Sequence, residues 1–191
     1  MERVLVAAVV VAALVSGCAR PTDPSADGPS ASATAPSASV TPTRTTAEVP
    51  PLHPSVDGYP AAHIGLRDPD GRLVEGVAVR VAATAAHRAH GLMEVRRLPE
   101  GSGMLFVFPD VRDGGFWMKN TLVPLSIAFA DADGAVLAIL EMVPCTTPQC
   151  EVYTPGVEYT YAFEVPAGWF DEVGLSIGWQ LDVPAGISAT E

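Results

Sequence analysis

Between residues 59 and 183, short apolar segments alternate with clusters of Gly, Pro, Asp and Asn. Most of these segments are shorter than a typical helix, and the clusters supply the backbone dihedrals of tight turns. This pattern predicts eight short strands, at 62–67, 72–83, 103–108, 115–120, 125–131, 135–143, 159–165 and 179–183. Short helices are expected at 84–93 and 167–173, the first capped by Thr84 and the second stopped by Gly174. The predicted fold is therefore mainly β: a compact, sandwich- or barrel-like single domain.

The stretch before this domain has a different composition. Of its 37 residues, 19–55, 27 are Pro, Ser, Thr or Ala, and large apolar side chains are nearly absent. Such a segment buries too little apolar surface to offset the entropy that folding would cost. We therefore expect a disordered tether at 19–55 and a folded domain at 56–191.

The first 18 residues have the features of an export signal. Arg3 precedes an apolar run of 12 residues, 4–15, and small residues then lead to Cys18. The run is too short to span a bilayer, which takes roughly 17–25 residues. Its end, VSGC, resembles the lipobox of bacterial lipoproteins, in which the cysteine is lipidated and becomes the new N-terminus. We expect an exported protein anchored to the outer face of a bacterial membrane by a lipid on Cys18; the alternative is an ordinary signal peptide with an incidental cysteine.

The other two cysteines, Cys145 and Cys150, lie five positions apart across a segment that contains a proline. Outside the cytoplasm such a pair is expected to form a disulfide, which would stabilise the fold by about 2 kcal/mol. A metal half-site would need further ligands nearby, and a redox pair usually has two intervening residues. The disulfide is the favoured prediction.

Charge narrows the range of partners. The chain carries 11 Lys and Arg against 22 Asp and Glu, a net charge of −11. An acidic surface repels phosphate, so we expect neither a nucleic-acid partner nor electrostatic adhesion to anionic lipid. No cofactor is predicted. His87 and His90 lie three apart with Glu94 beyond them, but without the context of a zinc motif we expect no metal.

The run FWMKNT, residues 116–121, combines two aromatics, an amide and Lys119, the only lysine in the chain. On a strand, alternate side chains point to opposite faces, so Phe116 and Met118 share one face while Trp117 and Lys119 share the other. One interpretation buries Phe116 and Met118 and exposes Trp117 beside Lys119. The alternative packs Trp117 inside, with Lys119 reaching water along its alkyl stem.

Four segments resemble a known family. They are RAHGLM (88–93), LPEGSGMLFVF (98–108), FWMKNT followed by Pro124-Leu125, and AGWFDEVGLSIG (167–178). The resemblance is to the bacterial and archaeal domain-of-unknown-function family 192 and covers about residues 60–184. It implies one compact β-rich domain, often exported, without an established activity. Members commonly carry acids where this chain has Ser126 and Trp179, which weakens an enzymatic interpretation here.

We expect a lipid-anchored binding or accessory module for a small, anionic ligand or an envelope component. The candidate ligand-binding residues are Arg88, Trp117, Lys119, Asn120 and Thr121. Arg88 and Lys119 together could hold an anion while Trp117 stacks on an apolar part of the ligand. The alternatives are a hydrolase or transferase of envelope material with Lys119 as base, and a structural partner of an envelope protein. No catalytic set is evident, so we do not predict an enzyme.

Overall fold

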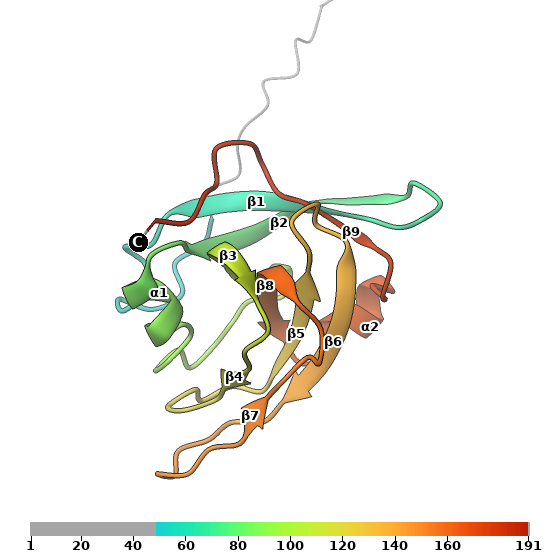
Figure 1. Ribbon diagram of the computed structural model, residues 1–191. Helices are drawn as coiled ribbons and strands as arrows, with labels where there is room; N and C mark the ends of the chain where they lie inside the picture. Colours follow the sequence, from blue (N-terminus) through green and yellow to red (C-terminus); the bar gives the residue numbers. More distant parts are fainter. Residues whose placement is uncertain (1–48, 191) are drawn as a thin grey trace, which may run out of the picture. The chain divides into compact units, whose positions relative to one another are not determined.

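The computed structural model describes residues 49–190, which form nine strands and two short helices (Figure 1). These are β1 (Ala61–Arg67), β2 (Leu73–Ala82), α1 (Ala85–His90), β3 (Ser102–Arg112), β4 (Phe116–Trp117), β5 (Leu125–Ala130), β6 (Val136–Met142), β7 (Val152–Tyr153), β8 (Tyr159–Pro166), α2 (Trp169–Val173) and β9 (Gln180–Asp182). The mainly β prediction is confirmed. The predicted export signal, with Cys18, and residues 19–48 of the predicted tether lie outside the described residues.

Seven strands form one sheet in the order β6-β5-β8-β3-β2-β1-β9. Only β2 and β3 run parallel among these neighbours, and the connection between them contains α1. The sheet curls into a half-barrel, and its edge strands approach each other where Val136 donates a hydrogen bond to the Trp179 carbonyl (Figure 1). A separate two-stranded ribbon, β4 with β7, completes the fold.

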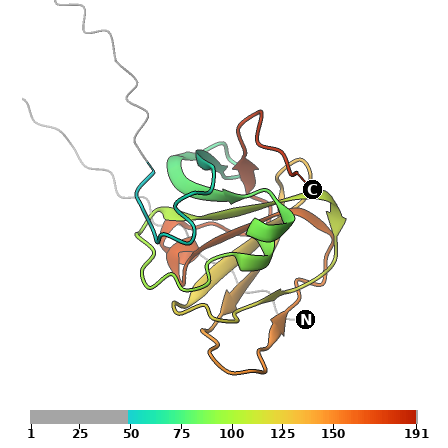
Figure 2. The same ribbon diagram turned by 90° about the vertical axis from the view of Figure 1, so that its left-hand side faces the viewer.

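Both faces of the sheet are covered. On one face Leu105, Val107, Phe163 and Val165 pack with the buried aromatics of α2, and we call it the α2 face. On the other face, Met104, Phe106, Ile127 and Phe129 pack with the 92–98 segment and with Phe116 and Met118; we call it the cleft face. Figures 1 and 2 show α1 and the β4–β7 ribbon lying on the same side of the sheet, and Figure 1 shows α2 away from both.

The predicted strands and helices are found, and the strands differ from the prediction in three ways. Strand β3 continues past the predicted end at 108 to Arg112, although Pro109 lies within it. Pairing between β3 and β8 jumps there from Val107 to Arg112, and proline is tolerated at such an irregularity because no ladder hydrogen bond is required of it. The predicted strand 115–120 shortens to two residues, and its partner β7 was not predicted.

Helix α1 begins where predicted and ends earlier. The Thr84 side chain accepts a hydrogen bond from the His87 amide at 3.0 Å, as expected of an N-cap. The helix stops at Gly91, whose φ of 54° suits glycine, rather than at residue 93. A Cβ at Gly91 would also lie 3.3 Å from the Phe106 ring, so this position joins the helix closely to the sheet.

The folded unit begins before residue 56. Val49 is buried, and Leu52 packs against the cleft-face core. The Pro50 carbonyl accepts a hydrogen bond from Arg80 at 3.3 Å. Contacts of the folded unit therefore begin earlier than composition predicted, because Val49, Pro50 and Leu52 all have partners on the domain.

Candidate functional site

The FWMKNT segment begins with strand β4 of the ribbon, and its side chains divide into an inner and an outer set. Phe116 packs edge-on against Phe106, with ring centroids 5.0 Å apart, and Met118 is fully buried. Trp117 is 50% exposed, and the Lys119 Nζ lies 5.1 Å from the centroid of its ring. The structure thus adopts the first of the two predicted arrangements, in which the apolar pair is inside and Trp117 stands outside beside Lys119.

Close packing at the start of the ribbon requires a glycine. A Cβ at Gly115 would lie 2.6 Å from the Val152 side chain and 2.8 Å from the Tyr153 carbonyl oxygen. The Tyr159 hydroxyl donates to the Gly114 carbonyl at 2.9 Å, which ties the same turn to strand β8. These contacts hold Trp117 in a defined position at the edge of the cleft face.

Asn120 and Thr121 have mainly structural contacts. Asn120 adopts a left-handed φ of 56°. Its backbone amide donates to the Cys145 carbonyl, and its backbone carbonyl accepts from the Glu94 backbone amide, both at 2.9 Å. Thr121 is buried and donates its amide to the Met118 carbonyl at 3.0 Å. Asn120 lies in a turn, and its hydrogen bonds fasten the FWMKNT segment to two neighbouring loops.

The predicted disulfide is present between Cys145 and Cys150. It closes the loop that precedes β7, and the backbone of Cys145 contacts FWMKNT at Lys119 and Thr121. The disulfide loop therefore supports the ribbon that carries Trp117.

Arg88 lies on α1 and points its guanidinium along the cleft face. Nη1 donates to the Ala83 carbonyl and, at 3.0 Å, to the Val107 carbonyl, while Cζ lies 5.5 Å from the centroid of the Phe108 ring. Arg112, at the end of β3, lies over the same ring at 5.6 Å. Partial burial, followed by the nearby Arg112 charge, lowers the pKa of Arg88. Within residues 49–190, neither guanidinium has a carboxylate partner.

A cleft of about 330 Å³ lies between α1, the end of β3 and the start of β4. Arg88 and Arg112 line it together with four aromatic rings, those of Phe108, Phe116, Trp117 and Tyr159. Binding pockets in proteins typically combine apolar and aromatic walls with a few polar groups, and this volume is at the lower end of their range. The cleft is suited to a small ligand that is negatively charged and partly apolar.

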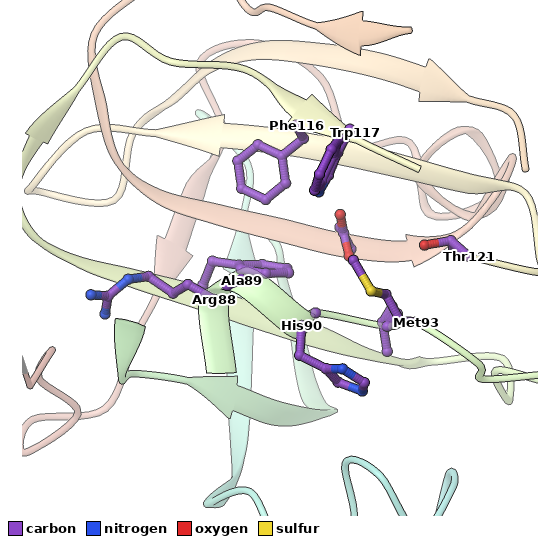
Figure 3. Close-up of a pocket in the computed structure, with 11 residues that line it drawn as sticks. Arg88, Ala89, His90, Met93, Phe116, Trp117 and Thr121 are labelled. Atoms are coloured by element: carbon purple, nitrogen blue, oxygen red, sulfur yellow. The ribbon is translucent and has the colours of Figure 1, made fainter. Parts of the chain in front are cut away.

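A second, smaller cavity of about 30 Å³ adjoins the cleft. In Figure 3, Phe116 and Trp117 lie on one side of it and Ala89, His90 and Met93 on the other, with Thr121 at one end. Arg88, Ala89, Phe116 and Trp117 line both spaces. The two spaces therefore share a wall.

Glu164 of β8 also lines the small cavity, and sequence reasoning missed it. The predicted strand at 159–165 alternates polar and apolar residues, a pattern typical of a half-buried strand. Instead β8 lies between β5 and β3 with both faces covered, so Glu164 is only 4% exposed. Burial raises the pKa of its carboxyl to about 8. The only signal in the sequence is a single acid within an apolar strand.

The structure brings together three of the five predicted ligand-binding residues. Arg88 and Trp117 line both spaces, and Thr121 lines the small cavity. Lys119 reaches the site only through its contact with Trp117, and Asn120 lines neither space. Sequence reasoning missed Arg112 and Glu164, since neither belongs to a recognisable motif.

The two histidines of α1 are not arranged as a metal site. His87 stacks on Tyr59 with ring centroids 3.8 Å apart, whereas His90 lines the small cavity. In the part of the chain that the structure describes, no group of three or more His, Cys, Asp or Glu side chains is placed to hold a metal ion.

The two positions at which the chain departs from the resembling family lie away from this site. The Ser126 hydroxyl accepts a hydrogen bond from the Gly168 amide at 2.9 Å, at the start of α2. Trp179 is buried in the α2-face core, 5.2 Å from the Arg72 guanidinium. Neither residue lines the cleft or the small cavity, so the loss of acids there does not alter the candidate site.

Comparison with known proteins agrees with this fold. A crystal structure of a "putative transcription regulator" from Sinorhizobium meliloti matches with a TM-score of 0.61 at 30% identity, over 65% of this chain and 94% of that protein. A protein of unknown function from Novosphingobium aromaticivorans matches with a TM-score of 0.59 at 27% identity, over 72% of this chain and 95% of that protein. No curated protein matches the chain. Within residues 49–190, no helix is long and apolar enough to cross a membrane.

The sequence profile of DUF192, described as an uncharacterized ACR, matches residues 67–183. This span runs from the end of β1 to just beyond β9 and includes Arg88, the FWMKNT segment and Glu164. The chain belongs to the DUF192 family.

Proposed function

We propose that this domain is a binding module for a small anionic ligand, held in the cleft between α1, β3 and β4. The observation that carries the proposal is the pair Arg88 and Arg112, which face a cleft with aromatic walls without a carboxylate partner among the described residues. On a chain with a net charge of −11, such a local concentration of positive charge is unusual and suits an anion.

The energetics of the two arginines support this proposal. Their Cζ atoms lie over the same Phe108 ring, and burial further disfavours the charge on Arg88. An anion between the guanidiniums would offset their mutual repulsion and accept hydrogen bonds from both. The Arg88 guanidinium is already positioned by the Val107 carbonyl, so little side-chain entropy is lost when the ligand binds.

The aromatic rings define the rest of the ligand. Phe116 is fixed by its ring contacts, whereas Trp117 exposes half of its surface at the edge of the cleft. A flat or ring-shaped apolar portion would pack against the indole and exclude water from it. A cyclic carboxylate is therefore the simplest chemical class that fits both parts of the site.

The proposal also concerns location. The lipobox-like sequence at Cys18 supports a module anchored to the outer face of a bacterial membrane through a lipid and a Pro/Ser/Thr/Ala-rich tether. Replacing Cys18 with alanine should release the protein from the membrane fraction. A Cys18→Ala protein that remains in that fraction would contradict lipid anchoring and leave the cleft proposal unaffected.

A hydrolase that uses Lys119 as base is less well supported. Lys119 lines neither the cleft nor the small cavity, and its Nζ lies over the Trp117 ring. A general base has to reach the proton that it removes, and here that reach would require the side chain to leave the indole. Nucleic acid is also not proposed as a partner, because the domain is strongly acidic.

Isothermal titration calorimetry with cyclohexanecarboxylate tests the binding proposal on the full chain in detergent. Arg112→Gln should weaken binding about tenfold, as expected when a charge-assisted hydrogen bond is lost. Arg88→Gln should have at least as large an effect, but it also removes contacts to two carbonyls. Arg67→Gln is the matched control, because Arg67 pairs with Asp182 and lines neither space.

Two results would contradict the proposal. One is the absence of measurable binding to the unmodified protein. The other is an equal loss of affinity in Arg112→Gln and in Arg67→Gln, which would indicate a general effect of net charge rather than a site.

A further inference from the structure

We propose that the ligand site has a second polar end, at which Glu164 binds a hydrogen-bond donor of the ligand, either a hydroxyl or an ammonium group. This inference rests on the proposed function, because the small cavity, which Glu164 lines, shares four of its lining residues with the anion-binding cleft. It identifies the ligand as a small cyclic molecule with an anionic group at one end and a donor at the other.

The first observation is the position of Glu164 in the sheet. On β8 it is paired with Met104 of β3 and Ile127 of β5, both of which are fully buried. Within residues 49–190, its carboxyl makes no ion pair, and Glu164 lines the small cavity. Burial makes this carboxyl costly to ionise, so an acid retained here requires a reason other than stability.

The second observation is the space that this carboxyl faces. The cavity of about 30 Å³ has room for about one water-sized group, such as a hydroxyl or an ammonium. Leu92, Met93 and Phe106 contribute apolar walls, and Glu164 is the only carboxylic acid among the residues that line this cavity. A donor group that entered would find the Glu164 carboxyl as a hydrogen-bond acceptor.

The third observation is the continuity of the two spaces. Trp117 and Phe116 of the ribbon and Arg88 and Ala89 of α1 line both of them. A ring stacked on Trp117 can therefore direct one substituent toward the arginines and the opposite substituent toward Glu164. In Figure 3 the Arg88 guanidinium points away from Met93 and His90, which is consistent with the anionic end lying outside the small cavity.

The charged and titratable groups around Glu164 are few. From α1, Arg88 and His90 line the small cavity, while the nearest partners on β3 and β5 are apolar. Arg80 lies on β2 opposite Met104, and its guanidinium is 3.5 Å from Asp57. No cation is therefore committed to Glu164 in the described part of the chain, and a ligand ammonium could take that role.

Burial raises the pKa of Glu164 to about 8, so the carboxyl is mostly protonated at neutral pH. A protonated carboxyl can accept a hydrogen bond from a hydroxyl without losing its proton. An ammonium group instead favours the carboxylate, so binding of an amino ligand releases the Glu164 proton to solvent. The two donors are therefore distinguishable by their pH dependence.

Three matched probes test the inference by calorimetry on the full chain in detergent: cyclohexanecarboxylate, trans-4-hydroxycyclohexanecarboxylate and trans-4-aminocyclohexanecarboxylate. They share a ring and a carboxylate and differ only in the donor at the opposite end. We expect at least one donor-bearing probe to bind about tenfold more tightly than cyclohexanecarboxylate, the gain typical of a hydrogen bond to a charged or desolvated group.

Two variants connect that gain to Glu164. Glu164→Leu should lose the advantage of the donor-bearing probes over cyclohexanecarboxylate. Glu164→Gln keeps the size and the acceptor but cannot ionise, so it should keep an advantage for the hydroxyl probe and lose one for the amino probe. Binding of the amino probe to the unmodified protein should tighten as the pH rises from 6 to 8, up to about tenfold per unit, and stay flat in Glu164→Gln.

The outcomes separate this inference from the proposed function. If all three probes bind equally, or if the donor advantage survives in Glu164→Leu, the role of Glu164 is refuted, while arginine-dependent binding leaves the anion site in place. If no probe binds the unmodified protein, both proposals are overturned.

Discussion

The two faces of the sheet are built from the same strands and differ in what they bury. On the α2 face, Phe163 and Val165 pack with Trp169, Phe170 and Trp179, and the buried Ser126 hydroxyl there is paired with the Gly168 amide. Glu164, which lies between Phe163 and Val165 on β8, belongs to the cleft face and is a buried acid that borders a cavity. Residues one position apart on a strand thus serve opposite faces, one closed and one with a polar opening.

This difference indicates where the fold is stabilised and where it can bind. A filled apolar face contributes transfer free energy and close packing. The cleft face gives up part of that contribution by holding an unpartnered carboxyl and by leaving Trp117 half exposed. Functional sites commonly carry such local losses of stability. Here these losses are confined to the cleft face, so the two faces differ in role.

The largest expected effect is on the α2 face. Phe163→Ala removes a fully buried ring and should lower the free energy of unfolding by about 3–5 kcal/mol, measured by urea denaturation. Affinity for cyclohexanecarboxylate, measured where the variant is folded, should be unchanged. A variant that lost affinity while keeping its stability would show that the two faces are not separable.

The disulfide tests how the ribbon of the cleft face is held. Replacing Cys145 and Cys150 with serine should lower the free energy of unfolding by about 2 kcal/mol, because it frees a short loop in the unfolded chain. The loop also contacts FWMKNT, so the Trp117 fluorescence should become more solvent-like. Unchanged stability under oxidising conditions would contradict a structural role for the bond.

Glu164 gives the cleft face a pH dependence that the α2 face lacks. The pKa of a glutamate near 4.5 in the unfolded chain is raised to about 8 in the fold, so between these values the folded state holds one proton more. The free energy of unfolding should therefore fall as the pH rises through this window, by up to about 1.4 kcal/mol per unit.

Glu164→Gln is the control for this dependence. Its stability, measured by urea denaturation from pH 5 to 8, should lack the decline that Glu164 causes. If the two proteins have parallel pH profiles, the carboxyl is not held protonated by burial.

The smallest expected effect on stability belongs to Trp117. Its side chain is half exposed, so Trp117→Ala should change the free energy of unfolding by only about 0.5 kcal/mol. Affinity for the cyclohexane probes should nevertheless fall, because the stacking surface of the cleft is removed. A large loss of stability without loss of affinity would assign Trp117 to the core rather than to the site.

Much of the fold could be predicted from turn residues and alternation. The strands, both helices and the disulfide depend on local signals in the sequence. In the structure Thr84 caps α1, Gly174 ends α2, and the two closely spaced cysteines form a disulfide. The two-residue strand β7 has no such signal, because it exists only through its pairing with β4. Its position depends on the long-range arrangement of the chain.

The site was only partly predictable for a similar reason. Trp117 and Arg88 lie in distinctive motifs, but alternation left two arrangements open for Trp117, and only the structure shows that its side chain is half exposed. Alternation failed for Glu164, because a central strand covered on both faces buries its polar face as well. Arg112 reaches the cleft because β3 continues past Pro109 with an irregular pairing to β8. The proline in the sequence does not indicate that the strand continues beyond it.

The three tryptophans of the chain allow a direct test of whether a ligand binds in the cleft, since each indole N–H gives a separate signal in an ¹⁵N-correlated NMR spectrum. Trp117 lines the cleft, whereas Trp169 and Trp179 are buried in the α2-face core. On titration with trans-4-hydroxycyclohexanecarboxylate, we expect the Trp117 signal to shift in a saturable manner while the signals of the other two tryptophans stay in place. A Trp117 signal that does not move, or shifts confined to Trp169 and Trp179, would contradict it.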